Sequence, residues 1–122
     1  MNISFDFDNT LSKPDVQDFV RYCMDKKITI WVITARSGSL YDTHNRDLYN
    51  VVTELNIEPT KVIFMNHVDK YNFLLNKDFI FHLDDDFIEV ELINENTQTL
   101  GVYKHPSVDW EEICWGRIKE LI

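Results

Sequence analysis

Three short apolar runs, rich in β-branched and aromatic residues, constrain most strongly how this chain can fold. They are ITIWVI at 28–33, KVIFM at 61–65 and FIFHL at 79–83. Their length suits strands, and their almost unbroken apolar character is typical of parallel strands that helices cover on both faces. Stretches in which apolar residues recur at helical spacing separate the runs. The pattern therefore predicts an α/β fold with a mainly parallel sheet.

Two further strands and the connecting helices complete the predicted order of elements. We expect strands at 2–7 and 99–103, and helices at 13–26, 41–55, 69–75 and 108–122. Residues 87–94 fit either a helix or a strand. No linker rich in Pro, Gly or Ser and no internal repeat interrupts the 122 residues, so we expect one domain over 1–122.

Charge and hydropathy limit the location and the partners that we expect. The chain has 12 Lys and Arg against 21 Asp and Glu, a formal net charge of −9. Such a charge argues against a non-specific coat on DNA or RNA, because that affinity comes from cations that neutralise phosphates. The longest unbroken apolar stretches, such as Ile30 to Ile33, are far shorter than the ~20 residues that cross a bilayer. The N-terminus reads as a strand with no signal peptide before it, so we expect a cytoplasmic protein without a membrane partner.

The cysteines, the central histidine and the tryptophans fit structural roles. Cys23 and Cys114 lie far apart and lack the spacing of a redox or zinc pair. His82 lies inside an apolar strand and reads as a hydrogen-bonded core residue. Trp110 and Trp115, on the last helix, either pack on the sheet or form the surface of a homodimer.

Polar residues follow several of the predicted strands at the point where each strand ends. Because ligands bind at the carboxyl ends of parallel strands, we expect these side chains to converge at one edge of the sheet. Lys70 comes a few residues after the third strand and belongs to the same edge. The others are Asp6 and Asp8 after the first strand, Thr34 after the second, and Asp84, Asp85 and Asp86 after the fourth.

The residue types at this edge point to phosphoryl transfer. Converging carboxylates repel one another and lose hydration, so a hard divalent cation is implied. Mg²⁺ suits one or two carboxylates together with waters and a substrate phosphate. The Lys70 ammonium and the Thr34 hydroxyl would attract a phosphate that carboxylates alone repel. The sequence therefore predicts a magnesium-dependent phosphoryl-transfer site.

The same residues, taken in order, resemble the four motifs of the haloacid dehalogenase (HAD) superfamily of phosphohydrolases. These are DFDNT at 6–10, Thr34, Lys70 and DDD at 84–86, and the resemblance covers 2 to about 94. It implies a Rossmann-like three-layer sandwich with strand order 5-4-1-2-3. Only 26 positions separate Asp8 from Thr34, and five separate Met65 from Lys70. Neither insertion point leaves room for a cap domain, so the resemblance implies a small capless member with an open site.

The resemblance also implies a role for each matching residue. Asp6 would attack phosphorus and form an aspartyl-phosphate, which divides hydrolysis into two easier steps. Asp8 would protonate the leaving alcohol and then take a proton from the attacking water. Thr34 would hydrogen-bond the phosphoryl group, and Lys70 would neutralise charge on it and on the nucleophile.

The metal ligands follow from the resemblance with one ambiguity of register. Asp6, the backbone carbonyl of Asp8 and the second member of the acidic pair, which we map to Asp85, would bind Mg²⁺. Asp84 would orient the lysine or a bound water, or would itself be the ligand, because the extra Asp86 leaves the register open by one.

Three more positions bear on the resemblance: one departs from the family pattern, one competes with Lys70, and one suggests a substrate. Asn9 stands where Gly is usual, and Asn also adopts left-handed backbone conformations. Lys77 competes with Lys70, which we prefer because it opens a helix directly after the third strand. Arg36 resembles an arginine that grips substrate in nucleotidase and polynucleotide-phosphatase members. We therefore expect Asn9, Thr34, Arg36 and Lys70 to bind substrate.

The predicted function is hydrolysis of a phosphomonoester. A nucleotide or a nucleic-acid terminal phosphate is the first expectation and a sugar phosphate the second, although the acidic surface argues against a long polymer. A catalytically silent binding or regulatory module on the same fold is the main alternative. A phospho-receiver domain is a further alternative, because such domains have a similar length and a Lys followed shortly by Pro after the fifth strand, as in Lys104-His105-Pro106 here. However, its third strand should end in Asp, and this chain has Phe64-Met65-Asn66.

Overall fold

The computed structural model describes residues 1–122 and shows an α/β protein built on a five-stranded sheet. All neighbouring strands are parallel, and their order is β3-β2-β1-β4-β5. The predicted fold class and strand order are confirmed, and no separate cap domain is present. The strands are β1 (Asn2–Phe5), β2 (Thr29–Thr34), β3 (Val62–Phe64), β4 (Phe79–Asp84) and β5 (Leu100–Tyr103).

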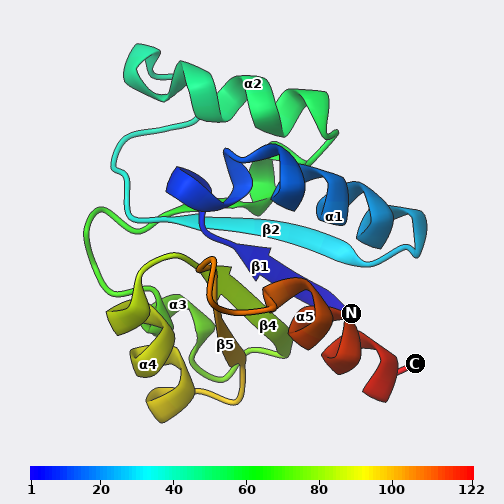
Figure 1. Ribbon diagram of the computed structural model, residues 1–122. Coiled ribbons are helices and arrows are strands. Elements are labelled where there is room, and N and C mark those ends of the chain that lie inside the picture. Colours follow the sequence, from blue (N-terminus) through cyan, green and yellow to red (C-terminus); the bar gives the residue numbers. More distant parts are fainter.

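Helices cover both faces of the sheet, with α1 and α2 on one side and α3 and α4 on the other (Figure 1). The C-terminal helix α5 shares the larger apolar core with α1 and α2. None of these helices combines the length and the apolar character that crossing a membrane requires. The helices are α1 (Pro14–Asp25), α2 (Arg46–Glu54), α3 (Tyr71–Leu74), α4 (Phe87–Asn96) and α5 (Trp110–Glu120), and the short turns are η1 (Phe7–Leu11), η2 (Thr43–Asn45) and η3 (Pro59–Lys61).

The segment that fitted either a helix or a strand is helix α4. Asp86 caps it, because its carboxylate accepts the backbone N–H groups of Ile88 at 3.0 Å and Glu89 at 3.4 Å. Such a cap satisfies donors that the first turn of a helix leaves unpaired. The third aspartate of the DDD motif thus has a structural role at the start of α4.

The second predicted helix begins later than expected, at Arg46 instead of residue 41. The buried Asn45 side chain donates to the backbone oxygens of Ser37 at 3.1 Å and Ser39 at 2.9 Å. These bonds hold residues 35–45 as a loop with a single turn, η2, before the helix. An asparagine side chain that satisfies loop backbone competes in this way with helix formation.

The residues expected to be structural are buried in the core. Cys23 and Cys114 are free thiols in the larger core, and Trp110 packs edge-on against Phe19 at 5.5 Å between ring centroids. His82 is fully buried in β4 and hydrogen-bonded on both ring nitrogens. These expectations are confirmed.

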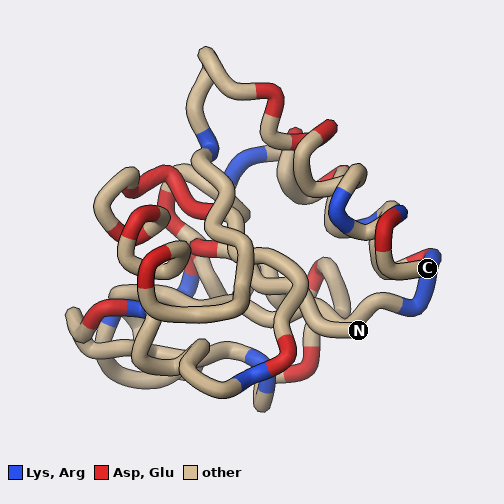
Figure 2. Tube along the Cα trace, turned by 90° about the horizontal axis from the view of Figure 1, so that it is seen from below, with Lys and Arg blue, Asp and Glu red and all other residues tan.

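Acidic residues gather at the edge where the strands end. In Figure 2 several acidic positions lie close together on that side, and the two chain termini lie on the opposite side. The turn after β1, the loop after β2 and the start of α4 all meet there. The fold therefore brings the predicted site residues to one edge of the sheet.

Candidate active site

The turn after β1 presents Asp6 at the end of the strand. Its backbone N–H donates to the oxygen of Leu83 at 2.9 Å, which continues the pairing of β1 with β4. The chain then curls through η1, where Asn9 has φ 59° in the left-handed region that asparagine tolerates. Thr10 Oγ1 donates to Asp6 Oδ2 at 3.3 Å, so a residue of the same turn holds the Asp6 carboxylate in place.

Lys70 lies between two buried carboxylates. Its Nζ donates to Asp6 Oδ1 at 2.8 Å and to Asp84 Oδ2 at 2.7 Å, and only 3% of the residue is exposed. Its own backbone N–H donates to Glu89 Oε2 at 3.2 Å, which ties the start of α3 to α4. Lys77 is exposed and lies 4.3 Å above the Phe73 ring, so Lys70 is the lysine that reaches the aspartates.

Three carboxylates meet at this point. Oxygen atoms of Asp6, Asp84 and Asp85 all lie within 4.8 Å of one another, close to the roughly 4 Å that separates opposite ligands of one Mg²⁺. Asp84 is already engaged, because Oδ2 accepts from Lys70 and His82 and Oδ1 accepts the N–H of Asp86 at 3.0 Å. No N–H group donates to Asp85. Its free lone pairs, with those of Asp6, therefore fit a hard divalent cation best.

The two aspartates that share Lys70 have opposite acidities. Burial, and next the charge of Asp84, raises the pKa of Asp6 from 3.8 to about 8. Burial alone would also raise the pKa of Asp84, but the hydrogen bond from His82 and the charge of Lys70 outweigh it and lower that pKa to about 2. The pKa of Lys70 is raised, because the charges of Asp84 and Asp6 outweigh the effect of burial. Neighbouring carboxyl groups with separated pKa values are common at catalytic sites.

Asp8 points away from this cluster toward Arg36. The guanidinium donates from Nε and Nη2 to Asp8 at 3.1 and 2.7 Å, and from Nη1 and Nη2 to Asp47 at 2.8 and 2.9 Å. Nη1 also donates to Asn45 Oδ1 at 3.3 Å, and the guanidinium carbon lies 5.0 Å from the Phe7 ring centre. All five N–H groups of the arginine are thereby used. In this arrangement Arg36 orients Asp8 and has no free donor for a substrate.

Thr34 and Asn9 make no hydrogen bond with the Lys70 cluster. Thr34 is buried at the end of β2, and its Oγ1 accepts the N–H of Arg36 at 3.2 Å. Asn9 is exposed, and its backbone N–H donates to Ser12 Oγ at 3.0 Å. Of the residues predicted for the site, the structure therefore groups Asp6, Lys70, Asp84 and Asp85 in one cluster, and Asp8 with Arg36 in a second.

Sequence reasoning predicted a hydrogen-bonded His82 but missed its partner Ser4 and the place of both residues beneath the cluster. Ser4 and His82 lie two residues before Asp6 and Asp84, and alternate residues of a strand share one face. Ser4 pairs with His82 across β1 and β4, and Ser4 Oγ lies 2.8 Å from His82 Nδ1. The repeated spacing of two polar residues in otherwise apolar strands is the signal that could have revealed them.

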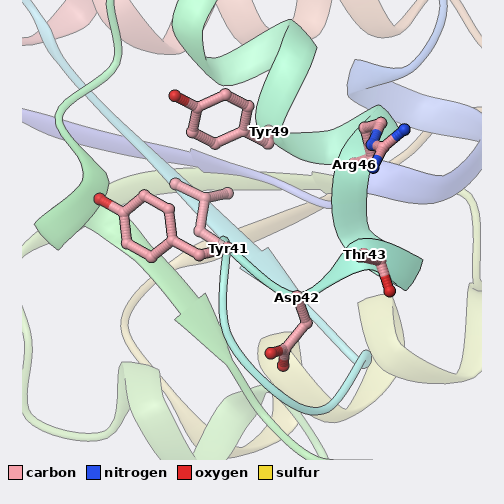
Figure 3. A pocket seen from close by; sticks show the side chains of 6 residues that line it. Tyr41, Asp42, Thr43, Arg46 and Tyr49 are labelled. Atoms are coloured by element: carbon pink, nitrogen blue, oxygen red, sulfur yellow. The ribbon is translucent and has the colours of Figure 1, made fainter.

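The loop before α2 carries a separate pocket of about 210 Å³. In Figure 3 the rings of Tyr41 and Tyr49 lie beside each other, with Arg46 and Thr43 on the other side of the pocket. None of the residues predicted for the site lines it. The candidate active site is thus the strand-end edge itself.

Comparisons of the chain with protein-family models and with curated proteins gave no match. The chemistry proposed below therefore rests on the arrangement of Asp6, Lys70, Asp84 and Asp85.

Proposed function

We propose that the protein is a magnesium-dependent phosphomonoesterase of the haloacid dehalogenase type. One observation carries the proposal, namely the buried Lys70 ammonium that bridges Asp6 and Asp84, with Asp85 beside them. A lysine and carboxylates at the carboxyl edge of a parallel sheet fit a phosphate accompanied by a cation. The four motifs noted in the sequence supply the same residues in the order of that superfamily.

Asp6 is the proposed nucleophile. One of its oxygens attacks phosphorus and forms an aspartyl-phosphate while the bond from phosphorus to the leaving oxygen breaks. Water then attacks the phosphoryl group, which releases inorganic phosphate and restores the carboxylate. Lys70, held 2.8 Å from Asp6, balances the charge on the nucleophile and on the phosphoryl oxygens.

Asp6, Asp85 and the backbone carbonyl of Asp8 are the proposed ligands of Mg²⁺. When bound, the ion neutralises the carboxylates and the substrate phosphate so that they can approach each other. Asp84 has its oxygens engaged by Lys70, His82 and the Asp86 N–H, which suits an orienting role.

Asp8 is the proposed general acid and base. It is exposed, and Arg36 holds both of its carboxylate oxygens. To protonate a leaving alcohol, Asp8 must turn from the guanidinium toward the substrate, and Asp47 keeps the guanidinium in place while it does so.

The proposed substrate is a nucleotide or a nucleic-acid end, with a sugar phosphate as the alternative. The open, capless edge supports the first class, because nothing encloses the leaving group. Arg36 adds little support, because its N–H groups are bound to Asp8, Asp47 and Asn45. The net charge of −9 favours a short substrate over a long polyanion.

Hydrolysis of an aryl phosphate, with and without Mg²⁺, tests the proposal. We expect the wild-type protein to show magnesium-dependent turnover and Asp6→Asn to show none. We expect Asp85→Asn to turn over substrate only at a higher Mg²⁺ concentration than the wild type needs. Asp78→Asn is the matched control, because Asp78 is exposed and precedes β4 at the opposite end of the strand from Asp84. Thermal unfolding confirms that each variant is folded.

Turnover that survives in Asp6→Asn would show that Asp6 is not the nucleophile and would refute the proposed aspartyl-phosphate mechanism. Absence of turnover from folded wild-type protein, on aryl phosphate and on a panel of nucleotides, phosphorylated oligonucleotides and sugar phosphates, would favour a binding module instead. A panel with activity only on sugar phosphates would leave the chemistry in place and change the substrate class.

A further inference from the structure

Ser4 and His82 form a polar pair in the buried face of the sheet that α3 and α4 cover. Both residues are 0% exposed, and they are register partners on the neighbouring strands β1 and β4. The same face carries the buried apolar residues Ile33, Leu74 and Ile93, and His82 is the only buried histidine of the protein. Burying such a pair costs free energy that apolar residues of the same size would not cost. A polar pair at this position therefore calls for a reason beyond packing.

The hydrogen bonds of the pair define the tautomer of His82. Asp84 Oδ2 already accepts from Lys70 at 2.7 Å, and an ionised carboxylate can only accept. His82 Nε2, 2.8 Å from the same oxygen, must therefore carry the proton and donate it. Nδ1 is then free to accept the hydroxyl hydrogen of Ser4 at 2.8 Å. With this tautomer, the bonds from Ser4 to His82 and from His82 to Asp84 each join one donor and one acceptor.

The pair is the far end of a chain of contacts that reaches Asp6. His82 donates to Asp84, Asp84 accepts from Lys70, and Lys70 donates to Asp6 at 2.8 Å. The carboxylate of Asp84 is held by His82 on the side facing the sheet and by the Asp86 N–H on the side facing the loop. These two bonds therefore hold Asp84 Oδ2 in the position from which it accepts the hydrogen bond of Lys70.

We propose that His82, held as its Nε2–H tautomer by Ser4, is a positioning residue that fixes Asp84 and thereby keeps the Lys70 ammonium on Asp6. The effect on turnover rests on the proposed phosphatase function. The effect on the structure does not, because it concerns only the position of Lys70. His82 lies beneath the carboxylates and touches no substrate, so it is not a catalytic residue.

The first test is the tautomer of His82 in wild-type protein. Nitrogen-15 NMR of histidine-labelled protein distinguishes the two ring nitrogens, and His82→Gln assigns the signal. We expect a protonated Nε2 and an unprotonated Nδ1, with the Nδ1 signal shifted in Ser4→Ala. A protonated Nδ1 in wild-type protein would overturn the proposal, whether or not the protein is an enzyme.

The second test compares two substitutions that differ in one hydrogen bond. His82→Gln keeps a side-chain N–H at the place of Nε2, whereas His82→Leu keeps the apolar volume and loses the donor. For aryl phosphate we expect kcat to fall roughly 10- to 100-fold in His82→Leu, as for other residues that orient the groups around a metal, with KM nearly unchanged. We expect His82→Gln to recover most of this loss. Thr99→Val, which removes a buried polar group just before β5, is the control.

A readout without turnover separates this proposal from the proposed function. The ammonium signal of the buried Lys70, assigned by its loss in Lys70→Met, reports the position of Nζ. We expect it to move or broaden in His82→Leu and to stay in place in His82→Gln. An unchanged Lys70 signal in folded His82→Leu would refute the positioning role. A shifted signal in a protein that hydrolyses no phosphate would keep that role and refute the phosphatase.

Discussion

At the scale of single residues, the surroundings of two aspartates that share one lysine give them different chemistry. Asp6 has only Thr10 and Lys70 as donors, and burial raises its pKa to about 8. Asp84 has Lys70, His82 and the Asp86 N–H, and its pKa is lowered to about 2 although burial opposes this. The carboxylate with fewer partners is the one left available for chemistry.

The contacts of Arg36 predict how its loss would depend on the leaving group. Arg36→Gln removes the bonds that orient Asp8, so it should weaken general-acid catalysis. For an alkyl phosphate, whose leaving oxygen needs a proton, we expect kcat/KM to fall roughly 10²-fold. For p-nitrophenyl phosphate, whose leaving group needs no proton, we expect little change. Arg21→Gln is the matched control, because Arg21 also pairs with two carboxylates, Asp18 and Glu54, but far from the site.

An equal rise in KM for both substrates would show instead that Arg36 grips the phosphate. Thermal unfolding of Arg36→Gln checks that the loop before α2 stays folded.

One buried hydroxyl outside the site predicts a gain in stability. Thr99 Oγ1 is buried and has no hydrogen-bond partner among the protein groups. Thr99→Val keeps the shape of the side chain and removes the unsatisfied group, so we expect the free energy of unfolding to rise by about 1 kcal/mol. Urea denaturation of both proteins measures the difference. A lower midpoint in Thr99→Val would mean that the hydroxyl is satisfied in solution.

At the scale of elements, the packing of α4 on β5 links the acidic edge to the rest of the sheet. Asn94 in α4 accepts the N–H of Gly101 at 2.8 Å and donates to its oxygen at 3.3 Å. These bonds occupy backbone groups that an edge strand would otherwise expose. Because Asp86, the residue after Asp85, caps α4, the position of the helix also sets that of the acidic residues.

Gly101 allows this close approach, and the prediction is that a methyl group there destabilises the protein. A Cβ at Gly101 would lie 2.7 Å from the Val90 oxygen and 3.2 Å from Val90 Cγ1. We expect Gly101→Ala to lower the free energy of unfolding by about 1–3 kcal/mol, as overpacking does elsewhere. Gly116→Ala is the control, because nothing lies within 4 Å of its Cβ position inside α5, and there we expect a gain of up to about 1 kcal/mol. Equal effects of the two substitutions would mean that α4 can move away from β5.

At the scale of the whole molecule, the acidic edge couples folding to protons and to a cation. Burial raises the pKa of Asp6 from its ordinary value of 3.8 to about 8 in the folded chain, so between these values the folded chain holds a proton that the unfolded chain releases. Without a cation, the contribution of Asp6 to stability therefore decreases as pH rises from about 4 to about 8. A cation bound to the ionised group opposes this decrease.

The resulting prediction is that Mg²⁺ stabilises the protein more at pH 8 than at pH 5. Mg²⁺ competes with the proton on Asp6, so we expect the rise in Tm at a fixed Mg²⁺ concentration to grow over this range. The rise should largely disappear in Asp85→Asn and persist in Asp78→Asn. A rise in Tm that is equal at both pH values, or that Asp85→Asn leaves intact, would place the cation elsewhere.

The amino-acid sequence by itself determined the alternation of strands and helices, the parallel sheet and the edge at which the polar residues meet. Apolar periodicity is local, and the carboxyl ends of parallel strands necessarily share one edge, so DFDNT at 6–10 and DDD at 84–86 had to lie at the same edge of the sheet. Asn9, at a position where Gly is usual, likewise indicated a left-handed backbone conformation, and its φ of 59° confirms this.

The tertiary structure alone decided which partner each polar side chain takes. Residues 87–94 became a helix because Asp86 caps it, and Arg36 turned to Asp8 and Asp47 because the Asn45 loop brings α2 close. The contact of His82 with Ser4 depends on the register of β1 against β4, which a bulge near the start of β4 shifts. Hydrogen bonds need atoms placed to within a few tenths of an ångström, and only the packed chain sets positions so finely.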